Sequence, residues 1–421
     1  MTEPTSPKTD PPPPVEGPSY QRILRHPPFF RVWLAQLVSQ SGDFIFEVAL
    51  IWLVLEATGS ILDVSLIVTG TLLPAVLLGP FLGVYIDRWD RRRTLIATNL
   101  LQGVTVGGLA LLILSGAASI GVIFGIILLL GTGARVVSIG TATYVPSLVA
   151  VEDLPPANSL LSLSESFNQI VGLSLGGLFV ALLGVTLPIE YDALTFFLSA
   201  GLIASVIPAS PVPKRPPTRA SFAQELRGGL AFIRENRFMI EIIVLGMLVN
   251  FFGNGVGALF APYTTRVLHG NSTVYGFLGA AVAVGSLVGA GAIGKVDTRK
   301  SAGRYLLAGG IGVGLSILFL GLVASVPLAL VLMLALGITI TIANLPMQTL
   351  LQAKVPDRLR GRVIATVGAL VMATGPAGPL ALGWMAAQTS LPLTLFLSGA
   401  VITGVLIVAW GVMRALRTIE Y

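Results

Sequence analysis

The stretch GVYIDRWDRRR at residues 83–93 contains a glycine, three apolar residues, an Asp-Arg pair and a run of three arginines. It closes the apolar run of residues 61–86. An apolar run of about 20 residues crosses the hydrocarbon core of a bilayer as a helix, whereas charged side chains enter that core only at a large cost. The stretch therefore marks one end of a membrane-spanning helix and indicates how the chain is threaded.

The composition of the whole chain supports a membrane class. Hydrophobic residues make up 54% of the chain and charged residues only 11%, against about 25% charged in an average soluble domain. The apolar runs are apolar all round, without the alternation of a membrane β-barrel. We therefore expect an all-α membrane protein with twelve transmembrane helices in two six-helix halves. The runs cover residues 29–55, 61–86, 94–115, 118–147, 159–183, 190–209, 239–264, 274–294, 304–324, 326–351, 363–388 and 391–413.

The basic residues predict the orientation. Of the 26 Lys and Arg residues, 24 fall in the two tails, in alternate connections or, for Arg31 and Arg304, within the first three residues of the span that follows; Arg266 lies in a connection on the other side and Arg135 inside a span. Cytoplasmic connections of membrane proteins are enriched in Lys and Arg. We expect a multi-pass protein of the cell inner membrane with both termini cytoplasmic. The sequence pI of 9.8 then reflects attraction to anionic lipid headgroups, and no nucleic-acid partner is expected.

The polar intervals divide the chain into five segments. We expect a disordered cytoplasmic tail at residues 1–28, with no cleavable signal peptide because the first apolar run is long and lies behind this tail. A six-helix bundle follows at 29–209, a cytoplasmic linker at 210–238, a second six-helix bundle at 239–413 and a cytoplasmic tail at 414–421. The linker is Pro-rich and then places apolar residues at helical spacing, which predicts a helix lying on the membrane surface; these residues are Phe222, Leu226, Leu230 and Ile233.

Several kinds of chemistry have no sequence support. Cysteine is absent and the two histidines, His26 and His269, lie far apart, so no metal ligand set is visible. The stretch GAGAIGKV at residues 289–296 resembles a phosphate-binding loop, but it ends a membrane helix, and Val296 replaces the required hydroxyl residue. We therefore expect neither an enzyme nor an ATP-driven pump, and no cofactor.

The two halves repeat weakly. TATYVP at residues 141–146 and TIANLP at residues 341–346 are offset by 200 residues. The second and eighth predicted spans both end in an Asp-Arg pattern, at Asp87 and Arg88 and at Asp297 and Arg299. Two repeated bundles with a binding site between them are typical of secondary transporters.

The loop at 83–93 resembles the signature loop of the major facilitator superfamily between its second and third helices. Gly83, Asp87 and Arg88 match directly, and Arg92 takes the first basic position. Asp90 replaces the usual glycine, as in the macrolide-efflux and enterobactin-exporter branch of drug:proton antiporters. Other stretches resemble the same branch, so that the likeness covers the chain after residue 20: PPFFRVWLAQLVSQSGDFIFEVAL, VPSLVAVEDLPPANSLLSLSES and VPDRLRGRV.

The resemblance implies a conformational latch at this loop. In the family the loop is thought to hold the outward-open state and to release as the halves rock, which implies that role for Gly83, Asp87, Arg88 and Arg92. A carboxylate at the end of a helix can accept from neighbouring arginines and from the exposed amides of an adjacent helix. The other two arginines of the loop, Arg91 and Arg93, are expected only to fix topology.

Charged residues inside the spans are the candidates for proton coupling, since such residues are costly and usually functional. Asp43 and Glu47 are four residues apart on one helix face. Two carboxylates this close in a low-dielectric setting do not both ionise easily, so one can carry a proton. Arg135, the intramembrane cation, is the expected partner of this pair and loosely resembles the fourth-helix arginine of proton antiporters. Glu165 is a further candidate.

Polar and helix-breaking residues within the spans indicate the cavity and the packing faces. Scattered amides suit loose recognition of an amphipathic ligand; these candidates are Asn168, Gln169, Asn250, Asn254, Asn344 and Gln348. Small residues let helices approach closely, and Gly and Pro interrupt a helix where it lines protein or a cavity. The candidates for packing and helix breaks are Gly172, Gly176, Gly177, Gly375, Pro376 and Pro379.

These observations favour a proton-driven secondary exporter of hydrophobic or amphipathic small molecules, of the kind that confers multidrug resistance. The expected partners are the small-molecule substrate, protons and the lipid bilayer. An importer or uniporter of a small metabolite remains open, as does a non-transporting membrane receptor or scaffold, which would tolerate loss of the intramembrane carboxylates.

Overall fold

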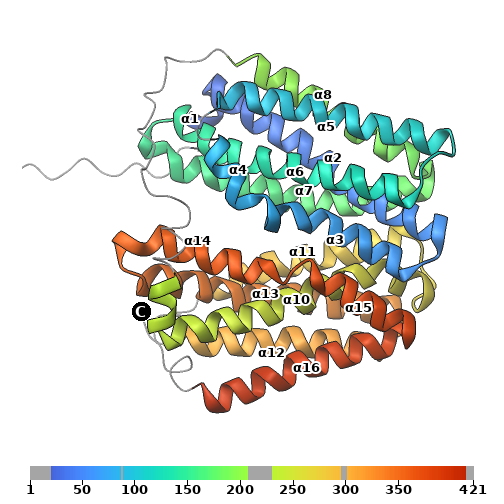
Figure 1. The fold of residues 1–421 in the computed structure, drawn as a ribbon, viewed down its shortest axis with the longest axis vertical. Coiled ribbons are helices and arrows are strands. Elements are labelled where there is room, and N and C mark those ends of the chain that lie inside the picture. The colour runs from blue at the N-terminus through green and yellow to red at the C-terminus, as the bar shows by residue number, and fades with distance from the viewer. Residues whose placement is uncertain (1–19, 87–88, 207–229, 295–300, 414–421) are drawn as a thin grey trace, which may run out of the picture.

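The computed structural model describes residues 20–86, 89–206, 230–294 and 301–413. Within these ranges every regular element is a helix (Figure 1). The first half contains α1 Tyr20–Leu24, α2 Pro27–Thr58, α3 Ile61–Leu77, α4 Gly79–Ile86, α5 Arg91–Leu114, α6 Ile120–Tyr144, α7 Leu154–Leu183 and α8 Thr186–Ala204. The second half contains α10 Arg237–Arg266, α11 Ser272–Ile293, α12 Ala302–Leu320, α13 Val326–Lys354, α14 Asp357–Ala373, α15 Ala377–Gln388 and α16 Leu391–Val412.

The helices give twelve spans in the described part of the chain. Eleven are long and apolar enough to cross a membrane by themselves, and α14 and α15 together make one of these. The remaining span consists of the shorter apolar helix α3 followed by α4. Pro80 lacks the N–H that would continue the hydrogen-bond ladder, so the helix restarts at Gly79 after a break. The prediction of twelve transmembrane helices in two halves is therefore confirmed.

The two ends of the bundle differ in charge. The helices alternate in direction, and one end, called the basic end below, carries Arg91, Arg237, Arg304 and Lys354 at or beside helix termini. The opposite end carries the short connections between α2 and α3, α5 and α6, and α7 and α8. This alternation is the one that the count of basic residues predicted.

The N-terminal segment is ordered further than expected. Residues 20–24 form α1, Ile23 is buried, and Arg22 forms an ion pair with Asp153 next to α7. Helix α2 starts immediately afterwards with prolines in its first turn, where the missing N–H costs nothing. The prediction of disorder is therefore wrong for residues 20–28, because Ile23 provides an apolar anchor. Residues 1–19 and 414–421, and most of the predicted linker helix, lie outside the described residues, although residues 230–235 are helical.

The outer surface of the bundle is apolar. Large side chains such as Val104 and Leu111 on α5, and Val408 and Val412 on α16, are 63–68% exposed. Contiguous apolar surface of this kind marks contact with an apolar environment, and in a helix every backbone polar group is already paired. The surface is therefore the face that meets lipid.

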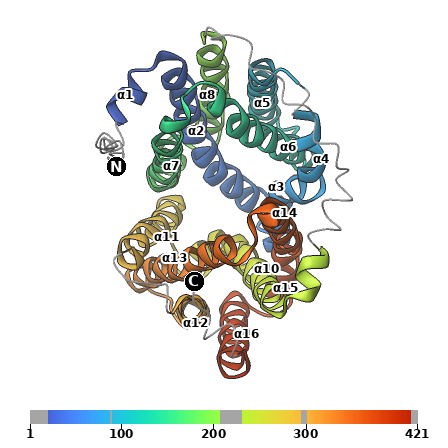
Figure 2. The same cartoon turned by 90° about the vertical axis from the view of Figure 1, so that its left-hand side faces the viewer.

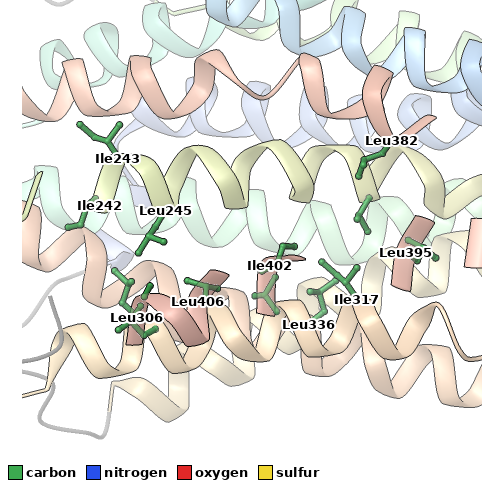
Figure 3. Close-up of a cluster of buried hydrophobic side chains, with 14 of the residues drawn as sticks. Ile242, Ile243, Leu245, Leu306, Ile317, Leu336, Leu382, Leu395, Ile402 and Leu406 are labelled. Carbon is green, nitrogen blue, oxygen red and sulfur yellow. The ribbon is translucent and has the colours of Figure 1, made fainter. Parts of the chain in front are cut away.

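The two halves have different interiors. The second half has a continuous apolar core, which packs α10, α12, α13, α15 and α16 together (Figure 3). In the first half α2 packs between α7 and α8, and α5 packs on α8 (Figure 2). It has two separate apolar clusters, one toward the opposite end and one at the basic end, and polar side chains lie between them.

The halves meet mainly along two helix pairs, α7 with α11 and α3 with α15. A Cβ atom at Gly177 of α7 would overlap the carbonyl oxygen of Ser272, and Gly276 Cα would lie 3.1 Å from it. The Arg266 guanidinium donates to the carbonyl of Gly59. All of these residues lie toward the opposite end. The halves are therefore in backbone contact at the opposite end.

Candidate functional site

A cavity of about 420 Å³ lies within the first half. This volume falls in the range of small-molecule sites, about 300–1,000 Å³. Its lining comes from the parts of α2, α6 and α7 nearer the basic end, with one residue each from α5 and α8: Gln36, Ser39, Gln40, Asp43, Gln102, Ala134, Val137, Ser138, Thr141, Ala142, Asn158, Leu161, Ser162, Glu165 and Phe196. Polar side chains make up most of the lining, which suits a site that admits water.

Two of the four predicted proton-coupling residues face this cavity. Asp43 on α2 and Glu165 on α7 both line it, and both side chains are exposed. Glu47 is one turn further along α2, outside the lining, and lies within electrostatic range of Asp43 and of Tyr275 on α11. The structure therefore brings Asp43, Glu47 and Glu165 to one region, and it places Glu47 at the contact with the second half.

Arg135 lies apart from these carboxylates. Its Nη2 is 3.8 Å from the sulfur of Met372 on α14, across the junction of the halves. The described residues form the ion pairs Arg22–Asp153 and Arg237–Glu241, and Arg135 belongs to neither. The expectation that Arg135 pairs with Asp43 and Glu47 is not met. The rotation of α6 about its axis is set by packing, and it turns this side chain toward α14.

The sequence analysis missed a carboxyl group behind the cavity. Asp192 on α8 is only 1% exposed, and its Oδ2 has no hydrogen-bond partner among the described residues. The Thr195 hydroxyl donates to the backbone carbonyl of Asp192 at 2.8 Å and lies 3.3 Å from Asp192 Oδ1. This Oδ1 is so close to Gly42 that a Cβ there would overlap it. A signal was present, since Asp192 is an acidic residue inside the predicted span 190–209.

Polar interior groups concentrate in the first half. Of the eleven buried side-chain polar atoms without a partner in the described residues, nine belong to it. Four of them belong to residues that line the cavity, namely Gln36 Nε2, Gln40 Oε1, Gln102 Oε1 and Thr141 Oγ1, and the other five are Ser65 Oγ, Asn99 Oδ1, Tyr144 Oη, Asp192 Oδ2 and Ser199 Oγ. Buried polar groups are normally paired with protein or ordered water, so this region is suited to hold water next to Asp43.

The predicted cavity amides fall in different places. Asn168 is buried and donates to the carbonyl of Leu37 at 2.8 Å, so it fastens α7 to α2 and does not line the cavity. Gln169 and Asn344 are exposed but lie outside the cavity lining. Asn250 and Asn254 on α10 face the break between α14 and α15 at Gly375. The side chain of Gln348 lies outside the described residues.

The predicted glycine and proline positions lie at close helix contacts or breaks. Gly172 and Gly176 face α2, where Gly176 would place a Cβ 3.1 Å from Ile45 Cα, and Gly177 faces α11. Gly375 and Pro376 lie between α14 and α15, and Pro379 is buried in α15. The Thr69 hydroxyl of α3 donates to the Pro376 carbonyl at 3.1 Å, so this break contacts the first half.

The described residues include only part of the predicted latch, Gly83 and Arg92. Gly83 lies in α4, whereas Asp87 and Arg88 lie outside the described residues. Arg92 donates to the carbonyls of Ile203, at 3.3 Å, and Ala204, which lie at the C-terminus of α8. Cations stabilise such a terminus. Arg92 therefore joins α5 to α8 within its own half.

Asp90, which replaces the glycine of the common loop pattern, is the N-cap residue of α5. Its Oδ1 accepts from the backbone N–H of Arg93 at 2.7 Å. Aspartate is among the residues favoured at this N-cap position, where its side chain satisfies an otherwise unpaired amide. The carboxylate in place of glycine thus gives the third span a defined start.

Twelve apolar spans in two halves, joined at one end and with a polar cavity near the other, define a secondary-transporter architecture. Residues 20–420 match the family model described as transmembrane secretion effector, and the chain belongs to that family, an efflux branch of the major facilitator superfamily. It is therefore a multi-pass membrane transporter.

Relatives of known function span most of the chain. Macrolide efflux protein A of Streptococcus pyogenes is 24% identical over 389 residues, covering 90% of this chain and 94% of that protein. Enterobactin exporter EntS of Escherichia coli O1:K1 / APEC is 26% identical over 344 residues, covering 81% of each. Both relatives are named as exporters.

Solved structures share the fold. The nucleoside transporter NupG superposes with a TM-score of 0.76 at 12% identity, covering 92% of this chain and 100% of that one. A bacterial homologue of the human lysosomal transporter Spinster, inward-facing and unoccupied, gives a TM-score of 0.70 at 15% identity, covering 93% and 96%. At these identities the likeness concerns the fold.

Proposed function

We propose that the chain is a proton-driven exporter of hydrophobic or amphipathic small molecules that works by alternating access between its two halves. The observation that carries this proposal is Asp43, an acidic side chain exposed in a cavity inside a membrane-spanning bundle. Intramembrane carboxylates are costly and mark ion or substrate pathways. The named activities of macrolide efflux protein A and of the enterobactin exporter support the direction and the substrate class.

The basic end is assigned to the cytoplasm, in line with the enrichment of Lys and Arg on that side. The halves touch at the opposite end, so the described conformation is inward-facing. A substrate enters the cavity from the cytoplasm or the inner leaflet. Rocking of the halves then separates α7 from α11 and α3 from α15 and opens the outer side.

Proton coupling in this scheme depends on the protonation state of Asp43. Dehydration disfavours the ionised carboxylate, so a conformation that dehydrates Asp43 is lower in free energy when the group is protonated than when it is ionised. Outward opening exposes the carboxyl to the more acidic side, and inward opening lets it release the proton. The proton gradient is the energy source, and no bound cofactor takes part.

The test is uptake of erythromycin and of ethidium by inverted membrane vesicles that contain either the wild type or Asp43→Asn. The expected result is uptake that depends on the proton gradient in the wild type and is lost in the variant. The matched control is Asp63→Asn, which changes an acidic residue in the first turn of α3 at the opposite end. Accumulation of the probes by whole energised cells indicates an importer. Gradient-independent movement indicates a uniporter, and a chain that moves no probe but binds one indicates a receptor.

A further inference from the structure

The carboxyl group of Asp192 has surroundings that no structural role explains. It is 1% exposed, lies inside a membrane-spanning helix, and has one oxygen to which no group in the described part of the chain donates a hydrogen bond. A purely structural carboxylate is paired with a cation or with several donors, because an isolated buried charge is very costly. A protonated carboxyl avoids that cost, and its hydroxyl can serve as a donor.

Asp192 lies directly behind Asp43. A Cβ on Gly42 would overlap both Asp192 Oδ1 and Thr195 Oγ1, so the backbone of α2 touches this pair. Asp43 is the next residue of α2, and its carboxylate lies within electrostatic range of Asp192. Glycine at position 42 therefore permits two carboxyl groups from different helices to lie close together, one in the cavity and one buried.

Of the described residues, Asp43 is the charged neighbour of Asp192, and Glu47, one turn further along α2, lies within electrostatic range of Asp43. On the facing parts of the packed helices α5 presents the amide of Gln102, and α7 presents Glu165 to the same cavity. On α8 itself Glu190 is two residues away and so points to a different face. Arg92 bonds to the carbonyl of Ile203, which is about 16 Å further along α8 at 1.5 Å per residue.

We propose that Asp43 and Asp192 form one proton-binding site. Asp43 exchanges a proton with water in the cavity, and Asp192 is the protonated carboxyl behind it, so that at most one of the two is ionised. In the loaded state both carboxyls carry protons and the pair is neutral. In the unloaded state the proton on Asp43 has returned to cavity water, and the remaining proton is shared, leaving a single negative charge on the pair.

This inference rests on the proposed function for the role of Asp43, but its test does not need transport. The full-length protein in lipid nanodiscs is titrated without ligand while infrared spectroscopy follows the C=O stretch of protonated carboxyl groups. The wild type is expected to show such a signal at neutral pH. Asp192→Asn should remove it, and Asp43→Asn should move the pH at which it disappears. Asp63→Asn is the matched control and should leave it unchanged.

Two outcomes overturn the pairing. The first is an Asp192→Asn spectrum identical to the wild type, which means that Asp192 is ionised. The second is a signal that Asp43→Asn leaves untouched, which means that the two groups are independent. Thr195→Val provides a second variant if Asp192→Asn does not fold. It removes the hydroxyl that donates to Asp192 and should shift the same signal.

A transport measurement separates this inference from the proposed function. In proteoliposomes, with erythromycin as the probe, Asp192→Asn is expected to lose gradient-driven transport while retaining exchange of the probe without a gradient. Normal gradient-driven transport by this variant overturns the role of Asp192 and leaves the proposed function standing. A wild type that ignores the gradient overturns the proposed function, and the infrared titration still decides the pairing.

Discussion

Replacing Gly177 with alanine adds a methyl group at the point where α7 touches α11. The added Cβ would overlap the carbonyl oxygen of Ser272 and lie 3.1 Å from Gly276 Cα. Both are backbone atoms and cannot rotate away. Overpacking of this kind costs about 1–3 kcal/mol, and the cost falls only on the state in which the opposite end is closed. The equilibrium is expected to move toward the outward-open state by about 5- to 150-fold.

The assay uses a cysteine as a reporter, which is convenient because the chain has none. Ser65 on α3 is fully buried at the junction of the halves and is near Gly383 of α15. In a Ser65→Cys background, a membrane-impermeant maleimide is expected to react faster when Gly177→Ala is added.

The matched control for Gly177→Ala is Gly125→Ala on α6. A Cβ at Gly125 would have no heavy atom within 4 Å. Alanine in place of glycine stabilises a helix by about 0.5–1 kcal/mol. Both substitutions have this effect, and it is the same in the inward- and outward-facing states. Equal labelling rates in the two variants would refute the assignment of this contact as the closed side.

Three further substitutions test local contacts. The methyl group of Gly42→Ala would overlap the buried Asp192 carboxyl of α8, and the loss of about 1–3 kcal/mol in the free energy of unfolding should lower the thermal midpoint in detergent. The control is Gly107→Ala, whose Cβ would lie 3.9 Å from its neighbour and which should not lower the midpoint. Equal midpoints in the two variants would contradict this packing. Asn168→Leu removes the hydrogen bond between α7 and α2 and should cost about 0.6 kcal/mol in an unfolding titration; an unchanged titration would show that the bond adds nothing. Thr69→Val removes the donor to the Pro376 carbonyl and should speed maleimide labelling at the same reporter; a slower rate would contradict its closing role.

The helices could be predicted from the sequence because each span is a local property. Apolar runs, basic connections and the break at Gly375 are visible without tertiary information. The extent of order near Ile23 was missed, since its burial depends on contact with distant parts of the chain. The repeat between the halves indicated the architecture, but not which helices touch.

The site was harder to predict because it depends on how each helix is rotated. Asn168 and Arg135 are polar residues inside spans, and the sequence alone could not show that one faces α2 and the other α14. Asp192 stands in the sequence as an acidic residue inside the predicted span 190–209, but its contact with Gly42, 150 residues away in the chain, is a tertiary feature. Asp43 was found because an acidic residue in the middle of a long apolar run is unusual in any orientation.

The most direct test of the account is simultaneous measurement of probe and proton movement by the purified protein in proteoliposomes. Erythromycin is supplied on the side of the basic end, and the compartment at the opposite end is made more acidic, so that the gradient drives protons toward the basic end. The account predicts that the wild type accumulates the probe against its concentration gradient while protons move the other way, and that Asp43→Asn abolishes both movements. Probe accumulation without proton movement, or unchanged coupling in Asp43→Asn, would contradict it.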